Sequence, residues 1–130
     1  MALDYDDSEK HMLVLEVADE FGVDPDAPKE CNVLFRELLA NYAGPNDTNA
    51  VAAWLREQIP KHFVSLGERP RWIQGAEWPF ANGKPMVFAG QIDISASAGK
   101  QLLPDFYHDD TSLYVFIGRQ AEPDVIIQQY

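Results

Sequence analysis

The side chains that could carry chemistry in this 130-residue chain are few, and they lie far apart in the sequence. The densest group is His108-Asp109-Asp110, three residues that can each bind a metal ion. Neighbouring ligands rarely converge on a single ion, so a metal site would need His62 or His11 as a further ligand. The simpler interpretation is a solvated acidic loop, and we therefore predict neither a metal nor a cofactor.

A second group of residues that could carry chemistry lies between positions 95 and 100. It consists of Ser95, Ser97 and Gly99-Lys100. They resemble a serine–lysine pair or a phosphate loop only superficially, because the Walker spacing and a following helix are both missing. Cys31 is the single cysteine. No residue beside it would lower the pKa of its thiol, so we expect a buried, unreactive side chain. With no nucleophile next to a base, the sequence predicts a protein that is not an enzyme.

Charge is the strongest binding signal in the sequence. The chain has 21 acidic and 10 basic residues, a net charge of −11, and ten of the acids fall within the first 30 residues beside only two lysines. Such a field repels nucleic acid and anionic lipid, and it attracts basic proteins. The candidate partner-binding residues are Asp4, Asp6, Asp7, Glu9, Asp19, Glu20, Asp24 and Asp26, with Asp109 and Asp110 as a second acidic loop. A solvated surface that serves solubility alone is the open alternative.

A stretch rich in tryptophan and proline, residues 68–94, runs from a loop into a strand-like segment. Trp72, Trp78 and Phe80 could line a pocket for a sugar or a planar ligand. Aromatic side chains held by flanking prolines also pack well beneath a long loop, and we favour this packing role. The residues to which we assign a structural motif are Trp72, Trp78, Pro79, Pro85, Gln91 and Asp93.

Two polar residues of this stretch, Gln91 and Asp93, fall on one face of the predicted strand because side chains alternate across a strand. They could face solvent, or they could bind backbone N–H groups of the Trp-Pro turn, which we favour. Asp93 has no base beside it in the sequence for a catalytic role. Arg69 and Arg71 flank Pro70, and they could hold a carboxylate ligand or pair with a neighbouring acid.

Hydrophobic periodicity predicts three helices in the first half of the chain, over residues 8–21, 30–42 and 50–59. Ser8 is the predicted N-cap of the first helix, and Gly22 is expected to close it. Residues 11–17 would also fit a strand. Pro60 is predicted to kink or end the third helix, because proline lacks an N–H group and clashes with the preceding turn.

Beyond Leu66 the pattern becomes strand-like. Residues 86–94 alternate so that Phe88 should lie on the face opposite Gln91 and Asp93. Apolar runs at 113–117 and 125–129 predict two further strands, which the short connection 118–123 should pair in antiparallel fashion. Helices followed by strands predict an α+β fold, in which a helical N-terminal half packs on a small, largely antiparallel sheet from the C-terminal half. We expect a single domain over residues 1–130.

Three further features bear on location. No apolar run approaches the ~20 residues that a membrane span needs. The first twelve residues are acidic and lack the basic and apolar regions of a signal peptide. A single cysteine suits a reducing compartment. We therefore predict a cytoplasmic protein that binds neither membrane nor nucleic acid.

Residues in the second half follow the order of a known family motif. They are Leu66-Gly67, Pro70, Trp78-Pro79, Gly83-x-Pro85-Met86-x-Phe88 and Gln91-Ile92-Asp93, followed by Leu113-Tyr114-Val115-Phe116 after Asp109-Asp110. This order resembles the YwqG-like family of small bacterial domains of unknown function. The resemblance covers about half of the chain, residues 66–117. The glycine pair often found before the prolines is reduced here to Gly67, and the chain stops soon after the second element, as in a short member.

The resemblance implies a fold more than a reaction, because the members are mostly uncharacterised. Some similar domains occur near bacterial toxin genes and look like immunity proteins. Combined with the acidity, this implies a protein that inhibits a cognate basic toxin, for example a nuclease, by occluding its active site. The alternative is a ligand-binding or regulatory module that uses an aromatic pocket around Trp72 and Trp78.

Overall fold

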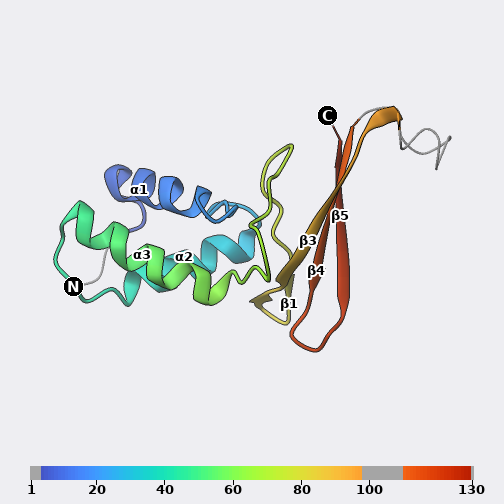
Figure 1. The fold of residues 1–130 in the computed structure, drawn as a ribbon. Helices are drawn as coiled ribbons and strands as arrows, with labels where there is room; N and C mark the ends of the chain where they lie inside the picture. The colour runs from blue at the N-terminus through green and yellow to red at the C-terminus, as the bar shows by residue number, and fades with distance from the viewer. Residues whose placement is uncertain (1–3, 98–109, 130) are drawn as a thin grey trace.

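In the residues that the structure describes, an N-terminal half of three helices is followed by a small antiparallel sheet, which is the predicted α+β class (Figure 1). The computed structural model describes residues 4–97 and 110–129. The helices are α1 (Ser8–Asp19), α2 (Lys29–Ala40) and α3 (Thr48–His62). The strands are β1 (Phe80–Ala81), β2 (Lys84–Pro85), β3 (Val87–Ile94), β4 (Thr111–Ile117) and β5 (Pro123–Gln129). Residues 63–79 connect the helical half to the sheet.

The three predicted helices are confirmed, with shifted ends. Asp7 rather than Ser8 is the N-cap of α1, since its carboxylate accepts hydrogen bonds from the backbone N–H groups of Glu9 and Lys10. The helix ends at Asp19, two residues before the predicted end. None of the helices in the described part of the chain is long and apolar enough to span a membrane.

Pro60 does not end α3 where the sequence predicted, because the helix continues to His62. Proline removes one intrahelical hydrogen bond. Here the loss falls in the last turn, and the ring itself is exposed to solvent. Ile59 and Phe63 on either side are buried, and the N–H group of Phe63 donates to the carbonyl of Ile59 at 2.8 Å. Burial of these two side chains therefore holds the final turn in place.

The main sheet has the order β3-β4-β5, and both of its pairings are antiparallel. The predicted hairpin between β4 and β5 is confirmed, although β4 begins at Thr111, before the predicted start. One prediction was wrong. A bulge between Phe88 and Gly90 shifts the register, so Phe88, Gln91 and Asp93 all lie on the same face. We call this the inner face, because Phe88 points from it into the core.

The strands β1 and β2, which have two residues each, pair as a hairpin that the periodicity did not predict. Its turn is Asn82-Gly83, and both residues have positive φ angles, 53° and 76°. Asn-Gly is the sequence typical of such turns, because both positions must adopt the left-handed region. The hairpin carries the chain from Trp78 into β3.

A run of aromatic contacts joins the helices to the inner face of the sheet. Phe35 stacks on Phe63 with ring centres 5.8 Å apart, and Phe63 meets the edge of Trp78 at 5.2 Å. Trp78 continues to Phe116 at 5.3 Å. Its indole is fully buried, and the indole N–H donates to the carbonyl of Met86 at 2.8 Å. Trp78 therefore occupies the junction between the two halves of the core.

Replacing Trp78 with alanine should lower the free energy of unfolding by ~3–5 kcal/mol, because it leaves a large cavity at this junction. Urea unfolding followed by circular dichroism measures the change. Leu66→Ala is the matched control, since Leu66 is 67% exposed and its truncation should change stability by less than ~0.5 kcal/mol. A Trp78→Ala protein as stable as the control would show that the junction is not closely packed.

Candidate functional site

The Trp-Pro loop, residues 68–79, has neither helix nor strand structure, so its backbone needs other hydrogen-bond partners. Gln91 on β3 provides a pair of them. Its side-chain oxygen accepts from the N–H group of Arg71 at 2.8 Å, and its side-chain nitrogen donates to the carbonyl of Arg71 at 3.2 Å. The predicted binding of loop backbone by Gln91 is confirmed.

Two more side chains of the inner face bind this loop. The Tyr114 hydroxyl accepts from the N–H group of Ile73 and donates to the carbonyl of Arg71, both at 2.9 Å. Gln128 on β5 accepts from the N–H group of Gln74 and donates to the carbonyl of Gly75, both at 2.8 Å. Each strand of the main sheet therefore contributes one side chain that binds the loop backbone. These side chains make the hydrogen bonds that a neighbouring strand would otherwise make.

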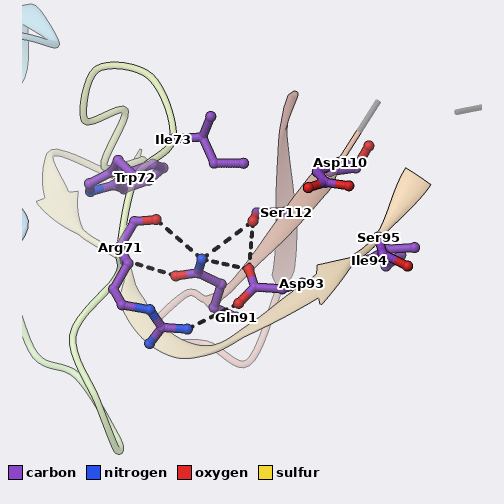
Figure 2. A pocket seen from close by; sticks show the side chains of 10 residues that line it. Arg71, Trp72, Ile73, Gln91, Asp93, Ile94, Ser95, Asp110 and Ser112 are labelled. Atoms are coloured by element: carbon purple, nitrogen blue, oxygen red, sulfur yellow. Dashed lines mark hydrogen bonds and ion pairs between the residues drawn. The ribbon is translucent and has the colours of Figure 1, made fainter. Parts of the chain in front are cut away.

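Asp93 supports this arrangement without contacting the loop backbone. Its carboxylate accepts hydrogen bonds from the Ser112 hydroxyl, from the Gln91 amide at 2.8 Å and from the Arg71 guanidinium at 3.1 Å (Figure 2). The hydrogen bonds from Ser112 and Gln91, followed by the contact with Arg71, lower the pKa of Asp93. Asp93 therefore stays ionised and orients Gln91. A carboxylate with a lowered pKa accepts a proton weakly, so Asp93 is a poor general base.

A cavity of about 580 Å³ lies beside these residues, bounded by Arg71–Ile73, Gln91, Asp93–Ser95 and Asp110–Ser112. Its volume is in the range of small-molecule sites. The polar side chains that line it nevertheless bind one another (Figure 2). Within the described residues, every buried polar side-chain atom has a hydrogen-bond partner. The hydrogen-bonding groups of Gln91, Asp93 and Ser112 in the cavity wall are thus already used to bind one another and the loop.

Trp72 separates this cavity from a second hollow on the other side of the loop. The indole is half-buried and stacks on Tyr114 with ring centres 4.3 Å apart. Its N–H group donates to the carbonyl of Gly22 at 2.7 Å, which ties the loop to the end of α1. Trp78, by contrast, has no exposed surface. Of the two tryptophans, only Trp72 can contact a bound molecule.

The second hollow, which we call the acidic groove, measures about 690 Å³ and lies between α1 and the Trp-Pro loop. Glu16, Asp19 and Asp24 line it, and so does Trp72. The groove also contains Arg71, whose guanidinium pairs with Glu68 at 3.0 Å and Asp93 at 3.1 Å. The three carboxylates consequently outweigh the single cation. Its full lining is Leu15, Glu16, Asp19, Gly22–Pro25, Pro70–Trp72 and Gln74–Ala76.

Most of the other predicted partner-binding acids already have contacts within the chain. Asp6 pairs with Arg36 at 2.9 Å and Glu20 with Arg56 at 3.0 Å, and these hydrogen bonds lower the pKa of both carboxylates. Asp26 accepts from the Tyr5 hydroxyl at 2.6 Å and lies 3.0 Å from His11.

The remaining acids of that prediction differ in role. Asp7 caps α1, Asp4 accepts from the N–H group of Asp6, and Glu9 is exposed. Asp110 accepts from the N–H group of Ala96 at 2.8 Å, whereas Asp109 lies outside the described residues. Asp19 and Asp24 are thus the two predicted acids that line the acidic groove, whereas Asp110 lines the other cavity. Sequence reasoning did not single out Glu16, whose i, i+3 spacing from Asp19 on a helix could have indicated a shared face.

The other candidates for chemistry do not assemble into a site. Among the residues that the structure describes, no three His, Cys, Asp or Glu side chains lie close enough to hold a metal ion. His108 lies outside this part of the chain. Cys31 is fully buried, and burial is the main cause that raises the pKa of its thiol to about 12, so it is unreactive.

Comparison with known proteins adds no relative to this picture. No protein-family model matches the chain, and neither the curated proteins nor the solved structures contain a significant match. The resemblance to the YwqG-like family stays a prediction that rests on the motif residues. In the structure, those of the motif residues that are described lie in and just before the Trp-Pro loop, in and beside the β1–β2 hairpin, on the strand β3, and on and just before the strand β4 that pairs with it.

Removing the side chains that hold the loop should destabilise the fold. Gln91→Leu and Gln128→Leu each leave backbone groups of the loop without partners, which should lower the free energy of unfolding by ~1–3 kcal/mol. Chemical unfolding measures this, and Gln120→Leu, in the exposed turn between β4 and β5, is the control. Equal stability of all three variants would contradict the holding role.

Stability should also fall at acidic pH with a contribution from Asp93. Its folded pKa is lowered, so its contribution is complete above the unfolded pKa near ~4 and is lost as the pH falls through the folded pKa. Unfolding at a series of pH values should show that Asp93→Asn is less stable at neutral pH and loses less stability on acidification. Parallel pH profiles for the two proteins would overturn this assignment.

Proposed function

We propose that this chain is a small acidic binding protein that docks a basic partner protein at the acidic groove. The partner that we propose is a cognate bacterial toxin, such as a nuclease, whose active site the bound chain would occlude. The observation that carries the proposal is the groove itself, which Glu16, Asp19 and Asp24 line together with Trp72. A cytoplasmic location and the absence of enzymatic activity belong to the same proposal.

The chemistry of the groove suits lysine and arginine side chains. Carboxylates attract the cation, and an indole beside them adds a cation–π contribution of ~0.5–2 kcal/mol. A groove of about 690 Å³ admits a few side chains rather than a folded domain, so a protruding basic segment would enter it. The net charge of −11 extends the attraction beyond the groove and speeds the encounter with a basic protein.

The groove is also held in shape before any partner arrives. Trp72 is fixed by its stacking on Tyr114 and by its hydrogen bond to Gly22. Asp24 accepts a hydrogen bond from the N–H group of Asp26 at 2.9 Å, which orders the turn that carries it. Preordered walls reduce the conformational entropy lost on binding and so favour affinity.

The alternative function, a ligand-binding or regulatory module, is supported by the cavity of about 580 Å³ on the other side of Trp72. We rank it second because the polar groups that line this cavity bind one another and the loop. A ligand would have to replace those contacts. A thermal-shift screen of metabolites with no response would count against this alternative.

The test of the proposed function uses a toxin encoded beside this gene, co-expressed with the chain in a bacterial host. We expect the wild-type chain to restore growth and to form a complex that weakens as salt increases. Glu16→Lys combined with Asp19→Lys should weaken the complex by about 100-fold, because two close charge pairs couple by at least ~3 kcal/mol.

The matched control is Glu37→Lys combined with Asp124→Lys. This double variant changes the net charge by the same amount, and both positions are exposed and lie outside the groove lining. It should still restore growth. A wild-type chain that gives no protection would contradict the toxin proposal, and equal weakening by both double variants would remove the groove as the contact surface.

A further inference from the structure

The acidic groove adjoins a third hollow of about 430 Å³, and Ala76 lines both. The same two segments of the chain form their walls. The turn between α1 and α2 contributes residues 22–25 to the groove and residues 27–28 to the third hollow, and the Trp-Pro loop contributes to both. The two hollows therefore make one channel. We call the third one the proline hollow, and its full lining is Ala27, Pro28, Glu30, Ala76, Glu77, Trp78, Pro79, Phe80 and Ile126.

The proline hollow differs from the groove in its chemistry. Its charged residues are Glu30 and Glu77, which are both exposed, and no lysine or arginine of the described chain lines it. Most of the remaining lining is apolar and only half-buried, so it is accessible to a bound side chain. These half-buried apolar residues are Pro28, Pro79, Phe80 and Ile126. An apolar hollow with two carboxylates at its border suits an apolar side chain that belongs to a basic segment.

The junction of the two hollows offers backbone hydrogen bonds to a partner. The N–H and C=O groups of Ala76 have no hydrogen-bond partner among the described residues. The positions on either side are held in place, because the Gln128 side chain donates to the carbonyl of Gly75 and to the carboxylate of Glu77, both at 2.8 Å. Main-chain hydrogen bonds combined with pockets for side chains are a common way to bind an extended peptide.

We propose that the channel binds one extended segment of the basic partner, with a lysine or arginine in the acidic groove and an apolar side chain in the proline hollow. Three carboxylates in the groove and two in the proline hollow line the channel, together with one arginine. This charge favours a basic segment over a second copy of a chain that carries −11. The inference rests on the proposed function, because it uses the same groove, and it adds that an apolar residue follows or precedes the basic one.

The test uses short synthetic peptides that are capped at both ends. Each carries a pair of arginines and a leucine, in either order, with a glycine spacer of varied length between them, and its reference has glutamine in place of leucine. Fluorescence anisotropy measures the Kd of each peptide for the wild-type chain. At the matching order and spacing we expect the leucine peptide to bind about tenfold more tightly than its reference, because burying a leucine side chain is worth about that factor.

Two results would overturn the inference, and they are distinguishable. Equal affinity of the leucine and glutamine peptides in every pair would remove the proline hollow while leaving the groove and the proposed function intact. Binding of neither peptide would contradict the groove as well. Methyl NMR locates the contacts, because Leu15 lines only the groove and Ile126 only the proline hollow. Both peptides should shift the Leu15 methyl signals, whereas only the leucine peptide should shift those of Ile126.

A variant that fills the proline hollow identifies the surface. Ala27 is exposed and lines this hollow, so Ala27→Phe should bind the leucine peptide no more tightly than its reference. Ala53→Phe is the matched control, because Ala53 is exposed on α3 and lies outside both linings, and it should keep the wild-type difference. Circular dichroism and thermal unfolding check that each variant is folded. A folded Ala27→Phe chain that keeps the difference would overturn the inference, and the Ile126 signals of the wild type decide it if that variant does not fold.

Discussion

The fold depends on one requirement, which is that the backbone of the Trp-Pro loop must find hydrogen-bond partners outside itself. The loop has no strand pairing of its own, and its prolines cannot donate. Unpaired buried backbone groups cost free energy comparable to a lost hydrogen bond. Gln91, Tyr114 and Gln128 meet the requirement from three different strands. The inner face must therefore be polar where the loop crosses it.

The bulge at residues 88–90 reconciles this polar role with the hydrophobic core. If residues 88–91 formed a regular strand with no bulge, strict alternation would place Phe88 on the face opposite Gln91. The shifted register puts both on the inner face, so Phe88 packs against Phe116 near the helices while Gln91 binds the loop further along β3. Trp78 fills the space at the join, where it contacts Phe63 and Phe116. One strand thus serves the core and the loop.

Most features governed by local sequence could be predicted, although the hairpin at Asn82-Gly83 was missed. The helices, the β4–β5 hairpin and the α+β class follow from periodicity and turn residues. The bulge could not be read from alternation, and the helix passes Pro60 because tertiary burial of Ile59 and Phe63 outweighs a local preference. The acidic groove was beyond sequence reasoning, because it joins residues 15–25 to residues 70–76. Only the folded chain shows which acids pair internally and which, like Glu16 and Asp19, border a hollow.

The distribution of charge over the molecule separates two kinds of acid. Asp6 and Glu20 pair with arginines, and Asp26 lies within reach of Tyr5 and His11, so these carboxylates help to fix the N-terminal segment and α1. The carboxylates of the groove have one cation beside them, Arg71, which is already paired with Glu68 and Asp93. Surplus like charge destabilises a compact state through self-repulsion. Solubility alone would be served equally well by scattered acids, whereas Glu16, Asp19 and Asp24 line one groove together with Trp72. This concentration of charge beside a preordered indole is the feature that supports the proposed basic partner.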